Sequence, residues 1–145
     1  MSLTEWLKAQ WLKPHQTSRQ EIRNLLGVAD RDLRDCQVKG LSDDWRLAIS
    51  YNAALQCAMT ALAACGCQPS RDAQHYRVIL SLEYTLGADN KLIAQFDAFR
   101  KKRNLGEYEV VGLTSKKEAD EMVALAQQLR KEVEQWLGAK HPELL

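Results

Sequence analysis

The sequence predicts an all-α fold, an up-down four-helix bundle with one or two additional short helices. Apolar residues recur at intervals of three and four along most of the chain, which is the spacing of one helix face. Capping residues and glycines divide this pattern into segments of helical length. The only β-like run, residues 108–113, is too short and too isolated to build a sheet. We expect a single domain over residues 1–145.

The composition is that of an ordinary soluble globular protein, with 46% hydrophobic and 27% charged residues. The net charge of +1 predicts no general affinity for nucleic acid or membranes, so any basic surface is local. No apolar run approaches the roughly 20 residues of a membrane span. The N-terminus also lacks the layout of a signal peptide. We therefore expect a cytoplasmic protein that does not interact with a membrane.

Six helices are expected, at residues 3–12, 18–40, 42–65, 74–86, 89–105 and 115–138. The first ends before Pro14, because proline and the residue before it disfavour the helical conformation. The second begins at Ser18 with a capping box. The third begins at Ser42, with acidic residues in its first turn that suit the helix dipole, and ends at Gly66.

The last three helices have similar signals. The fourth ends at Gly87, the fifth is capped by Asp89, and the sixth runs from a second capping box at Ser115 to Gly138. The second, third, fifth and sixth helices are long and amphipathic. Because the loops between them are short, we expect neighbouring helices to be antiparallel.

The stretch FRKKRNLGEYE, residues 99–109, contains four consecutive basic residues. Leu92, Phe96, Phe99 and Arg103 are spaced by four, three and four, which puts them on one helix face. A guanidinium therefore stands where the next large apolar residue is expected. The structural interpretation is that Arg100 and Arg103 extend to solvent at the end of the bundle or pair with Glu107, one turn further on.

The functional interpretation is a phosphate or nucleotide site at the end of this helix. Arg103 offers a planar, permanently charged fork. Asn104 can donate and accept hydrogen bonds, and Tyr108 offers a ring for stacking and a hydroxyl.

His75 is the second candidate, at the start of the fourth helix with Arg77 beside it. Its structural role would be to bond the backbone or cover the bundle end. Its functional role would be to contact phosphate near Arg103 or to supply an acid-base group. Tyr51 lies on an apolar stripe, which predicts core packing with a satisfied hydroxyl, whereas Asn52 either bonds a neighbouring helix or faces the motif.

No metal or cofactor is expected. Cys65 and Cys67 are separated by one residue, which is too close for a zinc knuckle, and no second ligand pair lies nearby in the sequence. The sequence has no glycine loop of the kind that cradles phosphates.

Three stretches together resemble HEPN domains (higher eukaryotes and prokaryotes nucleotide-binding). They are DWRLAISYNAALQCAMTALAACG, RDAQHYRVILSL, and FRKKRNLGEYE followed by SKKEADEMVALAQQLRKEVEQWL. These are similar to the family's alanine-rich helix with a central tyrosine, its next segment with a histidine, and its motif with the closing helix. The resemblance covers about residues 42–137. The family signature is Arg, often followed by Asn, and then His after four to six intervening residues.

The resemblance implies a helical bundle that works as a homodimer with the two motifs facing each other across a cleft. Many HEPN proteins are metal-independent ribonucleases, often toxins of toxin-antitoxin pairs, and a small nucleotidyltransferase is a frequent partner protein. Others have lost catalysis and act as RNA-binding or assembly modules.

Carried over by position, Arg103 is the motif arginine and Asn104 its companion, and the family histidine falls near Tyr108. A tyrosine departs from the pattern, because an unperturbed phenol with a pKa of about 10 is a poor base near neutral pH. If catalysis survives, the resemblance assigns it to Arg103, Asn104 and Tyr108, with His75 as a further candidate. The expected phosphate-binding residues are Arg100, Lys101, Arg103 and Arg77.

The departure favours a protein that binds RNA, a nucleotide or a partner protein within a toxin-antitoxin or defence system, with catalysis weakened or lost. One alternative is an active metal-independent ribonuclease that uses Arg103. Another is a helical adaptor whose resemblance to the family is only architectural.

Overall fold

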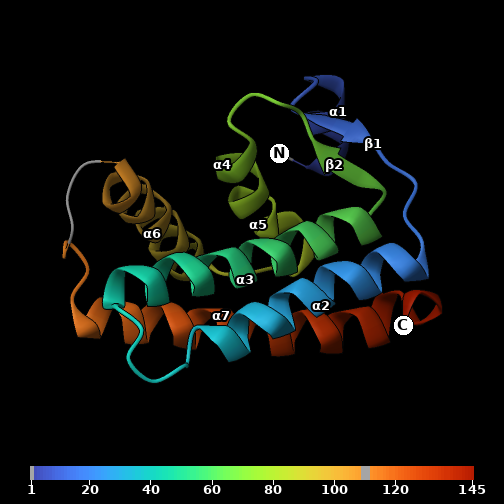
Figure 1. The fold of residues 1–145 in the computed structure, drawn as a ribbon. Coiled ribbons are helices and arrows are strands. Elements are labelled where there is room, and N and C mark those ends of the chain that lie inside the picture. Colours follow the sequence, from blue (N-terminus) through green and yellow to red (C-terminus); the bar gives the residue numbers. More distant parts are fainter. Residues whose placement is uncertain (1, 109–111) are drawn as a thin grey trace.

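The computed structural model describes residues 2–108 and 112–145, and the side chains of residues 2–104 and 112–145. The fold is mostly helical with one small two-stranded sheet, which confirms the predicted all-α class (Figure 1). In chain order the elements are α1 (Leu3–Lys8), β1 (Leu12–Pro14), α2 (Arg19–Asp35), α3 (Asp43–Ala64), β2 (Cys67–Pro69), α4 (Gln74–Leu80), α5 (Leu82–Thr85), α6 (Asn90–Tyr108), α7 (Lys116–Lys140) and a final 3-10 turn (Pro142–Leu144).

Helix α3 is the centre of the fold. It packs most extensively against α7 and α2, and α6, α4 and α5 contact it as well. Helix α2 runs opposite to α3, α7 runs in the same direction as α3, and α6 runs back towards the start of α3 (Figure 1). The strands β1 and β2, with α1, lie above the later part of α3, and α4 lies above its middle (Figure 1).

The central position of α3 follows from its composition. Its small buried side chains let neighbouring helices approach from several sides, and they include Ala53, Ala54, Ala58, Ala61 and Ala63. Among the described residues, α3 alone has the length and mean hydropathy of a membrane-crossing helix. However, 67% of that apolar window is buried inside the protein, which is the situation of a core helix in a soluble fold.

Serine caps begin the helices where the sequence predicts them. At α7 the capping box is complete, because Ser115 Oγ accepts a hydrogen bond from Glu118 N while the Glu118 carboxylate accepts one from Ser115 N. At α2, Ser18 Oγ accepts from Glu21 N at 3.1 Å. The Glu21 carboxylate accepts from Thr17 Oγ1 at 2.7 Å and not from Ser18 N, so only half of the predicted capping box at Ser18 forms.

The small sheet was not predicted, and the first helix is shorter than expected. A turn at Gln10, with φ of 63°, follows α1, and the chain then extends into β1. Strand β1 pairs antiparallel with β2, with Leu12 opposite Pro69 and Pro14 opposite Cys67. Three-residue strands are too short to give an alternating pattern, which is why the sequence did not reveal them. The predicted β-like run lies partly outside the described residues.

Other boundaries also differ from the prediction. Helix α6 ends at Tyr108, three residues beyond the predicted end at residue 105. The fourth predicted helix is divided at buried Ser81, whose hydroxyl donates to Val78 O at 2.7 Å. Helix α2 ends at Asp35, before the predicted residue 40. Helix α7 continues through Gly138 to Lys140, and the C-terminal segment packs against Gly138.

Candidate functional site

The apolar stripe of α6 ends on an arginine that contacts a buried aromatic ring. Phe96 and Phe99 are buried, as the stripe predicts. One turn later, the guanidinium carbon of Arg103 lies 5.4 Å from the centroid of the Tyr51 ring of α3. The face of an aromatic ring attracts a cation, so the ring explains how an arginine occupies this position in the stripe.

Tyr51 is almost completely buried and is held in one orientation. Its ring packs edge-on against Phe96, with ring centroids 5.6 Å apart. Its hydroxyl lies 3.3 Å from Nδ1 of His75, the second residue of α4. The prediction that Tyr51 packs in the core with its hydroxyl in a hydrogen bond is therefore confirmed.

Burial raises the pKa of Tyr51 to about 12, although the positive charges of Arg103 and Arg100 oppose the shift. The phenol is therefore protonated at neutral pH, and its hydroxyl shares a hydrogen bond with His75 Nδ1.

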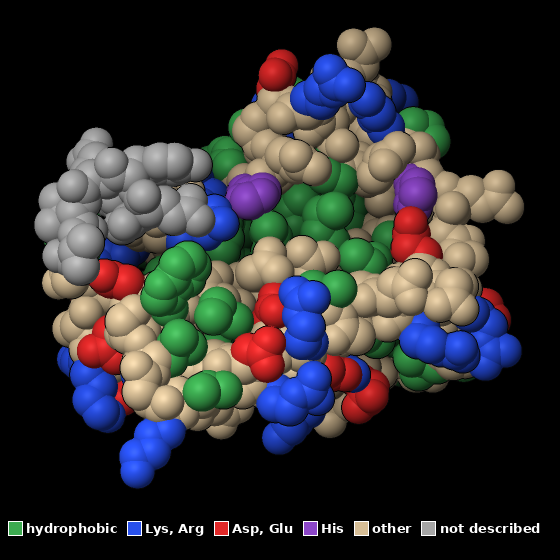
Figure 2. All heavy atoms as spheres, viewed as in Figure 1, with side chains coloured by type: hydrophobic (Ala, Val, Ile, Leu, Met, Phe, Trp, Pro, Cys, Tyr) green, Lys and Arg blue, Asp and Glu red, His purple; other side chains and the backbone are tan. Residues whose placement is uncertain are grey.

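Arg100 lies one turn before Arg103 on α6. Its Nε donates to Asp97 Oδ1 at 2.7 Å, and its guanidinium carbon lies 5.3 Å from the centroid of the Tyr76 ring. Tyr76 is 40% exposed and follows His75 on α4. We call Tyr51, His75, Tyr76, Arg100 and Arg103 the Arg103 cluster. Figure 2 shows a histidine beside basic side chains between α4 and α6.

Acidic partners neutralise part of the basic run. Lys101 Nζ lies 3.7 Å from the same Asp97 carboxylate, and Lys102 Nζ lies 3.2 Å from Glu118 at the start of α7. Asn104 is exposed near the end of α6, beside the cluster in sequence. Tyr108 is the last residue of α6, and its side chain lies outside the described residues.

Arg77 points away from the cluster. It follows His75 by two positions, and side chains two apart on a helix do not share a face. Its guanidinium carbon lies 4.2 Å from the Trp11 ring centroid, in the segment that carries the small sheet. The structure therefore brings His75, Arg100 and Arg103 together but puts Arg77 elsewhere.

Asn52 bonds a neighbouring helix, which decides between its two predicted roles. Its Nδ2 donates to Asp32 Oδ2 on α2 at 2.7 Å, and Arg31 Nη2 lies 3.0 Å from the other Asp32 oxygen. This network lies between α2 and α3. It connects the helices and is not part of the Arg103 cluster.

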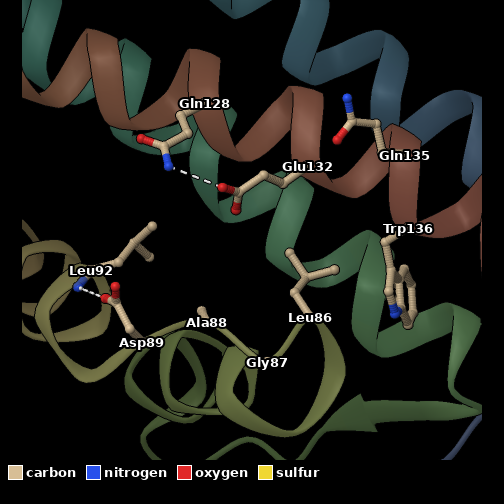
Figure 3. A pocket seen from close by; sticks show the side chains of 9 residues that line it. All are labelled: Leu86, Gly87, Ala88, Asp89, Leu92, Gln128, Glu132, Gln135 and Trp136. Atoms are coloured by element: carbon tan, nitrogen blue, oxygen red, sulfur yellow. Dashed lines mark hydrogen bonds between the residues drawn. The ribbon is translucent and has the colours of Figure 1, made fainter.

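A cavity of about 520 Å³ lies between the α5–α6 turn and α7 (Figure 3). Leu86, Leu92 and Trp136 supply much of its apolar lining. Its charged lining residues are Asp89 and Glu132, whose carboxylates repel phosphate. This cavity is therefore less suited to an anion than the Arg103 cluster is.

Sequence reasoning found Arg103 and His75 but missed how Tyr51 connects them, and it missed Tyr76. The pattern HYR, residues 75–77, puts an aromatic beside the histidine, and this was the available signal for Tyr76. Within the described part of the chain, no group of three or more His, Cys, Asp or Glu side chains is arranged to hold a metal ion.

The chain matches no protein-family model, and no curated protein sequence is significantly similar to it.

Proposed function

We propose that this protein binds RNA as a HEPN-like module whose catalysis is weakened or lost. In this proposal Arg103 and His75 of the Arg103 cluster contact the RNA phosphates. One observation carries the proposal: Arg103 and His75 come from different helices and contact the same buried ring of Tyr51. The fixed ring reduces the freedom that both side chains would otherwise lose on binding an anion. A guanidinium and an imidazole N–H are both suited to phosphate oxygens.

The surroundings of Arg103 support a polyanion as the ligand. Lys101 is largely exposed on α6, close in sequence to both arginines, and adds to a local basic surface. The net charge of the whole chain is only +1, so this concentration of cations on one helix is a local feature. The resemblance to HEPN domains favours RNA among the polyanions.

The chemistry of the cluster favours binding over cleavage. Cleavage through the 2′-hydroxyl needs an acid-base group that changes protonation near neutral pH. Tyr51, with a pKa of about 12, is not such a group. His75 is the remaining candidate among the described members of the cluster, and Tyr51 already occupies its Nδ1.

We extend the proposal to the fold type and assembly. The alternating chain directions of α2, α3, α6 and α7 support an up-down bundle with an inserted helical segment (Figure 1). The resemblance favours a homodimer within a toxin-antitoxin or defence system that includes a nucleotidyltransferase-type partner. The N-terminal sequence and the apolar pattern favour the cytoplasm as its location. Trp45 and Val38, which are 60% and 59% exposed, support a second copy as the covering surface.

The test is an RNA binding and cleavage assay without metal, on the wild type, Arg103→Ala and a control. Arg23→Ala is a matched control, because Arg23 is an exposed arginine on α2 outside the cluster. We expect Arg103→Ala to weaken binding on the order of tenfold and Arg23→Ala to change it little.

The possible results separate the alternatives. Cleavage that disappears in Arg103→Ala would replace the binding module with an active ribonuclease. Equal losses in Arg103→Ala and Arg23→Ala would show nonspecific attraction and overturn the proposal. Absence of RNA binding by the wild type would also overturn it and would favour a helical adaptor.

A further inference from the structure

Tyr76 is one of the large exposed apolar side chains, and its surroundings differ from those of the rest. Among the described residues the others are Val38, Trp45 and Leu145. Tyr76 follows His75, whose ring bonds Tyr51 at the centre of the Arg103 cluster. The guanidinium of Arg100 lies over the Tyr76 ring. An aromatic ring that is exposed and also restrained is suited to contact a flat ligand, because little side-chain freedom remains to be lost.

The arrangement of the two helices makes a pair of neighbouring subsites. Helix α4 carries His75 and Tyr76, and α6 carries Arg103 and Arg100. Arg103 and His75 share the Tyr51 ring, whereas Arg100 contacts Tyr76. The first subsite is therefore the Arg103 guanidinium beside the buried Tyr51 ring. The second subsite is the exposed Tyr76 ring, which Arg100 restrains.

Arg100 is suited to hold Tyr76 in place. Its Nε already bonds Asp97, which fixes the guanidinium and offsets part of its charge. The attraction between a guanidinium and an aromatic face then restrains the Tyr76 ring from one side. The exposed part of the ring remains available to a ligand.

We propose that Tyr76 is a stacking platform for a nucleobase, so that the cluster recognises single-stranded RNA in preference to duplex. This inference rests on the proposed function. In a duplex the bases are stacked on one another and cannot reach a side chain, whereas unpaired bases can splay out onto an aromatic ring. Every base has a flat face, so stacking of this kind depends little on sequence.

The experiment compares three probes of the same length: a single-stranded RNA, its duplex, and a single strand whose bases are replaced by abasic sites. Wild type, Tyr76→Ala and Tyr76→Phe are titrated with each probe, with Arg103→Ala alongside. Because Tyr76 is exposed, Tyr76→Ala is expected to fold, and circular dichroism checks this.

We expect the wild type to bind the intact single strand about tenfold more tightly than the duplex or the abasic strand. Tyr76→Ala should lose about that factor on the intact strand and change little on the abasic strand. Tyr76→Phe keeps the ring and should bind as the wild type does.

Equal binding of the intact strand by wild type and Tyr76→Ala would overturn the stacking platform. So would equal binding of intact and abasic strands by the wild type. If Arg103→Ala still weakens binding in either case, the proposed RNA function survives without this inference. If the wild type binds none of the three probes, both proposals fail, and a protein ligand on the exposed ring becomes the better explanation.

Discussion

The hydroxyl of Tyr51 lies 3.3 Å from Nδ1 of His75, so a buried side chain of the central helix reaches the first turn of α4. The same ring lies under the guanidinium of Arg103 on α6. Three helices therefore meet at one phenol. A change at this residue is expected to affect both the stability of the fold and the geometry of the proposed anion site.

The burial of Tyr51 predicts a specific loss of stability in alkali. Its pKa is near 10 in the unfolded chain and about 12 in the fold. Between these values the unfolded chain releases the phenol proton and the folded chain keeps it, so the free energy of unfolding falls as the pH rises. The contribution of one such group approaches about 1.4 kcal/mol per pH unit.

Urea unfolding of wild type and Tyr51→Phe from pH 9 to pH 12 measures this contribution. The difference in unfolding free energy between the two proteins should shift against the wild type over this range. Buried Cys57, whose pKa burial also raises to about 12, is present in both proteins and cancels in the comparison. Parallel curves for the two proteins would contradict the burial effect at Tyr51.

The salt dependence of RNA binding should distinguish ionic contacts from stacking. Each phosphate neutralised by a cation changes the slope of log K against log salt by about 0.7 for a single strand. Arg103→Ala and Lys101→Ala should each reduce the slope by about that amount. Tyr76→Ala should weaken binding at every salt concentration and leave the slope unchanged, because stacking releases no counterions.

The reverse pattern would argue against these roles. A slope that Tyr76→Ala reduces as much as Arg103→Ala does would mean that the two variants disturb one surface together. Titrations at several salt concentrations, with Arg23→Ala as the control, measure the slopes directly.

The sequence predicted those parts of the structure that depend on local periodicity. Phe96, Phe99 and Arg103 recur on one face of a single helix, so their common surface follows from helix geometry alone. The capping box at Ser115 is equally local, because its reciprocal bonds join residues three apart.

The contacts that make the site are not local. Tyr51 and His75 belong to different helices, and β2 and a turn separate them in the chain. The left-handed backbone of Ala73, with φ of 51°, immediately precedes α4, and no glycine marks it. The exposure of Tyr76 likewise depends on what packs around α4, and periodicity does not determine that.

The Asn52–Asp32 hydrogen bond should stabilise the fold without affecting RNA binding. Asn52→Ala leaves the buried Asp32 oxygen without its amide donor, so we expect a loss of about 1–3 kcal/mol in unfolding free energy. Gln56→Ala is the control, because Gln56 Nε2 donates to Asn52 Oδ1 over a longer distance of 3.3 Å, so its removal should cost less. A change in RNA affinity in a folded Asn52→Ala protein would connect this network to the site after all.

Asp44 should stabilise the protein at neutral pH but not in acid. Backbone N–H groups of Gly112 and Thr114 bond its carboxylate and hold the pKa of Asp44 below its usual value. Because the folded pKa is lowered, the contribution is complete above the unfolded pKa of about 3.9 and is lost as the pH falls through the folded pKa.

Urea unfolding of Asp44→Asn at pH 7 and at pH 2.5 tests this dependence. We expect the variant to be less stable by about 1 kcal/mol at pH 7, and the difference to shrink at pH 2.5. Asp72→Asn, a substitution at an exposed loop position, is the control. A difference that is the same at both pH values would mean that the charge of Asp44 is not what stabilises the loop.

Trp45 should mark the surface of the proposed homodimer. It lies in the first turn of α3, and Val38 lies in the nearby α2–α3 connection, so both exposed side chains belong to one end of the molecule (Figure 1). A second copy that covers this end would remove both from water.

Trp45→Glu would bury an unpaired charge in such an interface and should convert the dimer to a monomer. Light scattering at tens of micromolar protein measures the change in oligomeric state. Gln20→Glu is the control, because it adds the same charge at an exposed position of α2, at the other end of the molecule. A wild-type protein that is monomeric at these concentrations would contradict the dimer, whereas a dimer that persists in Trp45→Glu would place the interface on another face.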